Sequence, residues 1–217
     1  MSPPQRRSRR RWLAAAGTVA ALGGAGTSAP PDSPGMAETS LFGLAARGRR
    51  FVYVFDRSAS MAGRPLAAAK RELLSSLARL GDGEQFHVIF YNHRLHVFAP
   101  AGREGRAVFA TEANRAEARR FIGAVRADGG TRHAEPLAAA FRLRPDVVFL
   151  LTDGEDGDDL AAADLGRLER LAGGARLFVI RFAADGAPPS PRLAALCERT
   201  GGEHRTLDPF ALPEAAE

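Results

Sequence analysis

Residues 50–61 read RFVYVFDRSASM, an apolar run that ends in a carboxylate and two hydroxyls. Residues 51–55 are aromatic or β-branched throughout, which predicts a strand buried on both faces, as in a parallel sheet. Asp56, Ser58 and Ser60 follow at alternate positions, and an extended chain turns alternate side chains to the same side. Oxygen ligands of this kind suit Mg²⁺ or Mn²⁺. The same residue types also form turns and helix caps, so this stretch alone leaves a metal site and a structural turn open.

Beyond this stretch, apolar strand patterns alternate with amphipathic helix patterns. Asn92 and His93 join two of the strands in a tight hairpin, which predicts one antiparallel edge strand. The alternation indicates a doubly wound α/β fold with a mostly parallel central sheet and helices on both faces. The further strands are expected at residues 85–91, 94–98, 146–152, 176–182 and 203–206, and the helices at residues 65–80, 111–125, 135–142, 160–171 and 191–200.

The totals limit the kind of protein this can be. A chain of 217 residues with 45% hydrophobic residues allows one domain with a sizeable core. Residues 1–11 hold five arginines and no acid, which leaves 25 basic and 25 acidic residues in the remainder. This neutral body argues against a nucleic-acid partner, because phosphate backbones need a basic surface. Cys197 is the single cysteine, which excludes an intramolecular disulfide and a thiolate metal cluster.

The N-terminal segment has the layout of an export signal. Residues 1–13 are strongly basic, and residues 12–26 form a weakly apolar run that is short for a membrane span. Residues 8–13, SRRRWL, resemble the twin-arginine signal, with Trp in the place where Phe is usual. We therefore expect residues 1–29 to be an export signal that leads to the periplasm or cell envelope. The alternative is an N-terminal anchor that is retained, and membrane association is expected only through this segment.

Residues 30–40 are expected to be a linker rich in Pro and Ser, and residues 41–212 the folded domain. Within that domain, Asp56 and Asp153 each follow an apolar strand directly. Because ligands of such sheets bind beyond the carboxyl ends of the strands, both carboxylates are expected in one crevice. A loop with Gly129, Gly130 and Thr131 lies between them in the chain.

Taken together, these three motifs resemble the von Willebrand factor type A domain and its metal-ion-dependent adhesion site. They are Asp-x-Ser-x-Ser after the first strand, Gly-Gly-Thr in a middle loop and Thr-Asp-Gly after a later strand. The resemblance covers roughly residues 41–210 and implies a Rossmann-like fold. Residues 41–44 and 144–146 also look like a bacterial subgroup of exported or membrane-associated members.

The resemblance implies a metal site and a way of binding. The metal is Mg²⁺ (or Mn²⁺), and an acidic side chain of a partner protein completes its coordination. Ala59 stands where glycine is commoner in the family, which removes no ligand. The implied metal ligands are Asp56, Ser58, Ser60, Thr131 and Asp153, and the residues expected on a partner-binding rim are His133, Ala59 and Glu155.

Three functions follow from these expectations. The leading one is a binding module, not an enzyme, that recognises a protein through a divalent cation. A structural or assembly subunit would instead bind its partner whether or not metal is present. A metal-assisted hydrolase would need a positioned base, for which His133 is the candidate.

Overall fold

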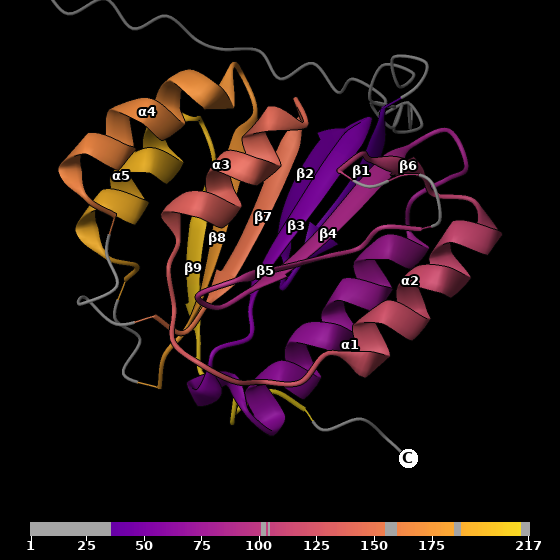
Figure 1. The fold of residues 1–217 in the computed structure, drawn as a ribbon, viewed down its shortest axis with the longest axis horizontal. Helices are drawn as coiled ribbons and strands as arrows, with labels where there is room; N and C mark the ends of the chain where they lie inside the picture. The colour runs from indigo at the N-terminus through magenta and orange to yellow at the C-terminus, as the bar shows by residue number, and fades with distance from the viewer. Residues whose placement is uncertain (1–35, 101–102, 104, 155–159, 185–187, 214–217) are drawn as a thin grey trace, which may run out of the picture. The chain divides into compact units, whose positions relative to one another are not determined.

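The computed structural model describes residues 36–213, apart from 101–102, 104, 155–159 and 185–187. A seven-stranded sheet has the strand order β5-β4-β3-β7-β8-β9, and β6 also pairs with β4. Figure 1 shows helices on both sides of this sheet. Its strands are β3 (Arg50–Asp56), β4 (Gln85–Tyr91), β5 (Leu95–Val97), β6 (Val108–Phe109), β7 (Val147–Thr152), β8 (Arg176–Phe182) and β9 (His204–Leu207).

The pairing confirms the doubly wound, mostly parallel α/β fold. Strand β3 is parallel to both β4 and β7, and β8 is parallel to both β7 and β9. The antiparallel edge holds two short strands rather than one, because β5 pairs with the end of β4 and β6 with its beginning. The chain winds from β3 toward β4 on one side and from β7 toward β9 on the other. The winding direction therefore switches between β3 and β7, where such sheets bind ligands.

Five helices within the described residues cover the two faces of the sheet (Figure 1). Helices α1 and α2 lie on one face, and α3, α4 and α5 lie on the other. Alternate residues of β3 point to opposite faces, so that Tyr53 joins the first core and Val54 the second. The helices are α1 (Arg64–Ala78), α2 (Glu112–Ala124), α3 (Ala134–Arg142), α4 (Ala162–Ala172) and α5 (Pro191–Arg199).

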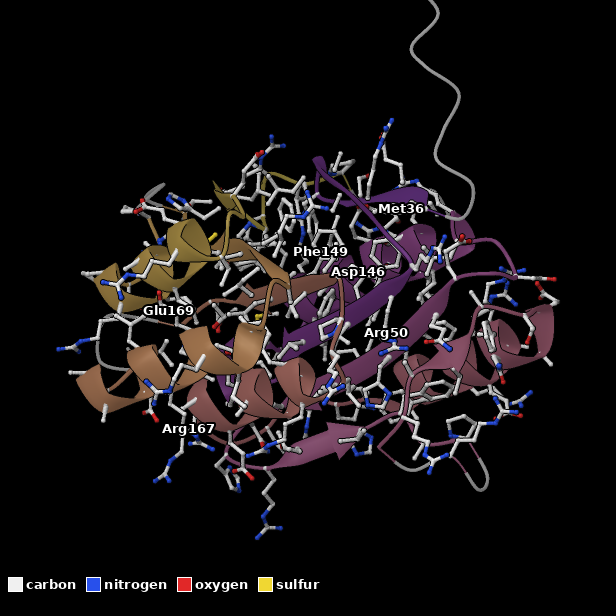
Figure 2. The ribbon with its side chains drawn as sticks, turned by 90° about the horizontal axis from the view of Figure 1, so that it is seen from above. Met36, Arg50, Asp146, Phe149, Arg167 and Glu169 are labelled. Atoms are coloured by element: carbon white, nitrogen blue, oxygen red, sulfur yellow. The ribbon has the colours of Figure 1, made fainter. Side chains whose placement is uncertain are left out.

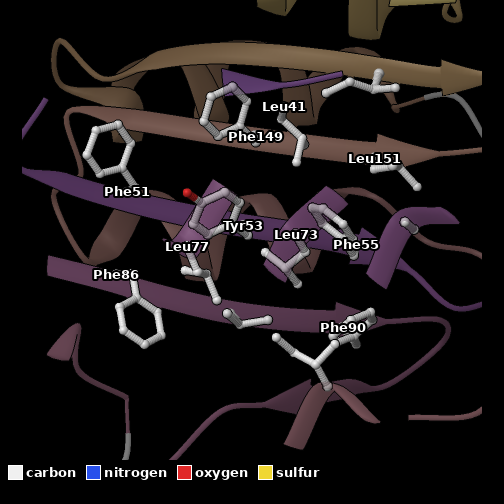
Figure 3. Close-up of a cluster of buried hydrophobic side chains, with 14 of the residues drawn as sticks. Leu41, Phe51, Tyr53, Phe55, Leu73, Leu77, Phe86, Phe90, Phe149 and Leu151 are labelled. Atoms are coloured by element: carbon white, nitrogen blue, oxygen red, sulfur yellow. The ribbon is translucent and has the colours of Figure 1, made fainter. Parts of the chain in front are cut away.

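The first core is rich in aromatic rings (Figure 3). Tyr53 of β3 stacks on Phe149 of β7 with 5.6 Å between ring centroids, and Leu73 and Leu77 of α1 are buried in the same cluster. The hydroxyl of Tyr53 lies 2.9 Å from the hydroxyl of Ser76, so its polar end is paired inside the core. Full burial of each such ring contributes about 2–3 kcal/mol, which holds β3 firmly in the middle of the sheet.

A hairpin that the sequence analysis does not predict precedes the sheet. Its strands, β1 (Ala37–Leu41) and β2 (Leu44–Gly48), pair antiparallel, and β1 lies mostly in residues 30–40, the expected linker. Phe42 and Gly43 have φ angles of 49° and 77°, the pair of left-handed conformations typical of a two-residue hairpin turn. The backbone N–H of Phe42 donates to Glu72 Oε1 at 2.8 Å, and Arg205 Nη1 donates to the Phe42 carbonyl at 2.9 Å.

The amino edge of the sheet is held by a carboxylate. Asp146 precedes β7, and its Oδ2 accepts hydrogen bonds from the backbone N–H groups of Arg49 at 2.6 Å and Arg50 at 2.9 Å. Figure 2 shows Arg50 and Asp146 beside each other at this edge. The side chain thus fixes how the chain enters β3.

Cys197 is fully buried on α5, as expected for a small apolar residue. Its Sγ donates to the Leu177 carbonyl at 3.0 Å, and burial raises the pKa of the thiol to about 12.

Within the described part of the chain, no helix has the length and hydropathy that crossing a membrane requires. The expected export signal, residues 1–29, lies outside the described residues.

Candidate metal centre

The five predicted ligands all lie at the carboxyl edge of the sheet. Asp56 is the last residue of β3, and Ser58 and Ser60 belong to the turn that follows, which includes the short 3-10 helix η1 (Ala59–Met61). Thr131 lies in the loop between α2 and α3, and Asp153 directly follows β7. Because β3 and β7 are neighbouring parallel strands, their ends carry both carboxylates to the switch point.

The side chains of these residues converge. The hydroxyl oxygens of Ser58 and Ser60 lie 3.1 Å apart, and Ser58 Oγ lies 3.4 Å from Asp153 Oδ1. Thr131 Oγ1 lies 3.3 Å from Asp56 Oδ2, although Thr131 is 75 residues further along the chain. The fold thus gathers two carboxylates and three hydroxyls from three separate segments at one place.

Asp56 is a buried carboxylate that has no positively charged partner in the described part of the chain. Asp56 is fully buried, with 0% exposure. Its carboxylate accepts hydrogen bonds from the Ser58 backbone N–H at 2.7 Å and the Thr152 hydroxyl at 2.8 Å. Burial raises the pKa of Asp56 to about 6 against the opposing effect of these hydrogen bonds, and the charge of Asp153 raises it further. Among the described residues, no Lys, Arg or His forms an ion pair with either aspartate.

This arrangement fits a hard divalent cation. Two carboxylates match a charge of +2, and the hydroxyls of Ser58, Ser60 and Thr131 add oxygen atoms without adding charge. Within the described ranges, no three or more His, Cys, Asp or Glu side chains are grouped to hold a metal. The donor set is therefore one of carboxylate and hydroxyl oxygens, which favours Mg²⁺ or Mn²⁺ over softer ions.

A second layer of contacts fixes the loop that carries Thr131. The Ala59 backbone N–H donates to the Gly129 carbonyl at 2.9 Å, which joins this loop to the serine turn. Gly129 has a φ of 70°, and a Cβ there would lie 2.6 Å from His93 Nδ1, so both conformation and space require glycine. Asp128 forms an ion pair with Arg57, and its Oδ1 accepts a hydrogen bond from Asn92 Nδ2 at 2.6 Å.

Thr152 has a role that the sequence analysis did not assign. Its hydroxyl donates to Asp56 and accepts a hydrogen bond from the Gly154 backbone N–H at 2.9 Å. It therefore orients both the buried carboxylate and the loop that carries Asp153. The signal was present, because Thr152 opens the Thr-Asp-Gly motif, but its spacing did not reveal which carboxylate it bonds.

The residues expected on the rim have different positions. His133 is not on the rim, because it is only 3% exposed, with Nδ1 2.8 Å from the Tyr91 hydroxyl. It lies under the loop after β7, where a Cβ on Gly154 would be 2.9 Å from His133 Nε2. Ala59 is exposed in the serine turn. Glu155 lies outside the described residues.

A hollow of about 360 Å³ opens next to the converging side chains. Ser60, Thr131 and Asp153 line one side of it, and Phe182 and Phe210 are among the apolar residues on the other. The candidate metal centre is thus open to a partner on the side of β8 and β9.

Comparisons with known proteins agree with this geometry. Residues 51–155 match the sequence profile of the von Willebrand factor type A domain. A von Willebrand factor type A protein from Catenulispora acidiphila has a similar structure, with a TM-score of 0.64 and 25% identity over 81% of this chain and 43% of that one. The conserved hypothetical protein BatB from Bacteroides thetaiotaomicron has a TM-score of 0.57 at 15% identity, over 74% of this chain and 91% of that one.

Proximal thread matrix protein 1 from the mussel byssus shares the fold, with a TM-score of 0.53 and 15% identity over 81% of this chain and 46% of that one. That structure has zinc in its metal-ion-dependent adhesion site.

Human inter-alpha-trypsin inhibitor heavy chain H4 is 27% identical over 126 residues, which are 52% of this chain and 13% of that protein. The pig (Sus scrofa) protein is 28% identical over 120 residues, with shares of 49% and 12%. This chain thus spans about an eighth of the length of the curated relatives it matches.

The fold, the converging oxygens and these matches together identify the domain. The chain carries a von Willebrand factor type A domain. Domains of this family commonly act as metal-dependent adhesion or interaction modules.

Proposed function

We propose that this chain is a protein-binding module that works through a divalent cation, Mg²⁺ or Mn²⁺. The observation that carries the proposal is the buried Asp56 carboxylate, which has no ion-pair partner among the described residues and lies in the cluster formed by Asp153 and the hydroxyls of Ser58, Ser60 and Thr131. Asp56, Ser58, Ser60, Thr131 and Asp153 would hold the cation. When bound, the cation supplies a coordination position that a carboxylate of a partner protein can fill.

The position of His133 supports a binding role over hydrolysis. A metal-assisted hydrolase needs a base that reaches the substrate. His133 was the candidate base, but its ring packs edge-on against Tyr91 and does not line the hollow beside the metal centre. We therefore propose recognition without turnover.

The proposal includes a place of action. The basic and apolar pattern of residues 1–29, with twin arginines in residues 8–13, supports export to the periplasm or cell envelope. The partner would then be an envelope or secreted protein with an exposed acidic residue. A fusion of residues 1–36 to a reporter tests this step, and retention of the reporter in the cytoplasm would contradict it.

A pull-down from envelope extract tests the function itself. The full chain is used as bait in Mg²⁺, in chelator, and as the Asp153→Ala variant in Mg²⁺. We expect a partner that is retained only by the unaltered chain in Mg²⁺. If the same proteins are retained in all three conditions, the chain is a metal-independent assembly subunit instead.

A further inference from the structure

The hollow beside the metal centre has two chemically distinct sides. Oxygen-bearing side chains form the first, as described above. The second side is apolar, and none of the described residues that line it is charged. It consists of Pro65, Phe182, Ala183, Ala184, Pro209 and Phe210.

Phe210 is an exposed aromatic residue at the edge of this hollow. It is 59% exposed, and within the described residues only two other large hydrophobic side chains, Met36 and Phe109, are comparably exposed. Burial of such a ring against a partner is favourable, because it removes apolar surface from water. An exposed ring at the edge of a hollow therefore provides a driving force for binding an apolar group.

The backbone around Phe210 holds this ring in place. The Phe210 N–H donates to Asp208 Oδ1 at 2.8 Å, and the Ala211 N–H donates to the Asp208 carbonyl at 3.2 Å. Two residues later, the Leu212 carbonyl accepts a hydrogen bond from Arg64 Nη2 at 3.2 Å. The backbone that carries the ring is thus anchored, so that little backbone entropy is lost when a partner packs against it.

The opposite part of the apolar side is also rigid. Phe182 is buried at the end of β8, and its ring meets Phe42 edge-on with 5.3 Å between centroids. The next residue, Ala183, donates its N–H to the Leu207 carbonyl at 2.9 Å. The hollow is therefore preformed by the ends of β8 and β9.

We propose that this hollow receives a bulky apolar side chain from the same partner segment that supplies the carboxylate. The inference rests on the proposed function and adds its specificity. The recognised unit is an acidic residue with a bulky apolar residue beside it in the partner. The carboxylate matches the cation, and the apolar neighbour packs against Phe210 within the hollow of about 360 Å³.

Synthetic peptides test this specificity directly. Each nonapeptide has a central Asp in a Gly/Ser background, and one flanking position carries Leu, Phe, Ser or Lys in turn. Binding of the full chain is measured in Mg²⁺ and in chelator. We expect the best Leu or Phe peptide to bind about tenfold more tightly than the matching Ser peptide, with all binding lost in chelator.

Two variants locate the preference. Phe210→Ala should bring the ratio of Leu or Phe to Ser peptides close to one. Phe109→Ala is the matched control, because Phe109 is 46% exposed on β6 and pairs with the beginning of β4, at the other end of the sheet. It should keep the full preference. Urea midpoints of both variants report whether each still folds.

The outcomes separate this inference from the proposed function. If peptides bind in a chelator-sensitive way but Leu, Phe and Ser peptides bind equally, the inference is wrong and the proposed function stands. The same holds if Mn²⁺ binds by calorimetry but no peptide is retained, or if the preference survives in Phe210→Ala. If neither Mn²⁺ nor any peptide binds, both are wrong.

Discussion

Two aspartates at opposite ends of β7 behave differently. Asp146, before the strand, accepts hydrogen bonds from two backbone N–H groups at 2.6 and 2.9 Å. Asp153, after the strand, has a hydroxyl of Ser58 at 3.4 Å. Asp146 thus holds backbone N–H groups at the amino edge of the sheet, whereas Asp153 remains available for a ligand at the carboxyl edge.

Arg50, a positive charge at the amino edge, also forms hydrogen bonds within the fold. Arg50 donates from Nη1 to the Leu143 carbonyl at 2.9 Å, near the end of α3, and from Nε to Gln85 Oε1 at 2.8 Å. An arginine here satisfies carbonyls that a helix end leaves free and complements the helix dipole. Charge at the amino edge thus builds structure, whereas at the carboxyl edge the two predicted ligand aspartates, Asp56 and Asp153, have no ion pair among the described residues.

The largest effect on Mn²⁺ affinity should appear when Asp146 and Asp153 are each replaced by alanine in separate variants. Asp153→Ala should lower Mn²⁺ affinity at least about 100-fold, because it removes one of two carboxylates that balance the cation. Asp146→Ala should leave Mn²⁺ affinity unchanged. Isothermal titration calorimetry measures both, and equal affinity of Asp153→Ala and the unaltered chain would contradict the site.

The amino half of β4 should make stability depend on pH. Burial lowers the pKa of His87 to about 4, partly opposed by a hydrogen bond with the backbone of Arg106. Because the unfolded chain binds this proton near pH 6.5 and the folded chain only near pH 4, stability falls as pH falls through that window. The loss should approach about 3 kcal/mol at pH 4.

Urea unfolding between pH 7 and pH 4 measures this loss, and His87→Gln, which cannot titrate, should remove most of it. If the two proteins lose stability equally, His87 is not the group responsible.

Replacing the two aspartates should affect stability in the opposite order: Asp146→Ala should destabilise the protein more than Asp153→Ala does. Asp146→Ala should lower the free energy of unfolding by about 1–2 kcal/mol, because two backbone donors lose a charged acceptor at an exposed position. Asp153→Ala should change it by less than about 0.5 kcal/mol. Denaturant unfolding in chelator checks this, and a larger loss for Asp153→Ala would remove the distinction between the two edges.

A smaller effect should come from the hydroxyl beneath Asp56. Thr152→Val should lower Mn²⁺ affinity by about tenfold, since it removes the donor that orients this carboxylate. Thr200→Val is the control at the amino edge, where the Thr200 hydroxyl accepts a hydrogen bond from the Leu177 N–H at 3.2 Å. It should cost stability without changing Mn²⁺ affinity. An equal loss of affinity in both variants would point to general destabilisation.

Two of the buried strands could be predicted to the residue. The pattern gave residues 85–91 and 176–182, and β4 and β8 have these bounds, because strands covered on both faces need unbroken apolar runs. The hairpin β1–β2 was missed. Its strands are short and rich in alanine and polar residues, and its turn places Phe42 in a left-handed conformation. Contacts with Glu72 and Arg205, 30 and 163 residues away, hold that turn, and no local pattern reveals them.

In the candidate site, the ligand residues could be predicted from the sequence, but the contacts that support them could not. Its five oxygen-bearing residues stand out in the sequence because each sits in a short motif at a strand end or a glycine-rich loop. Their supports do not. The ion pair of Arg57 with Asp128 and the burial of His133 under Gly154 depend on segments that meet only in the folded chain. The ligand set remains a prediction until a cation is measured.

The burial of Cys197 makes the chain convenient for site-specific labelling. The chain has no other cysteine, and this thiol is buried, hydrogen-bonded and held protonated by its high pKa. Thiol-reactive dyes attack the thiolate and should leave it unmodified in the folded protein. A cysteine introduced at position 109 or 210 would therefore be the single reactive thiol. A dye at position 210 would then report binding at the hollow, and a dye at position 109 would be a reference at the other end of the sheet.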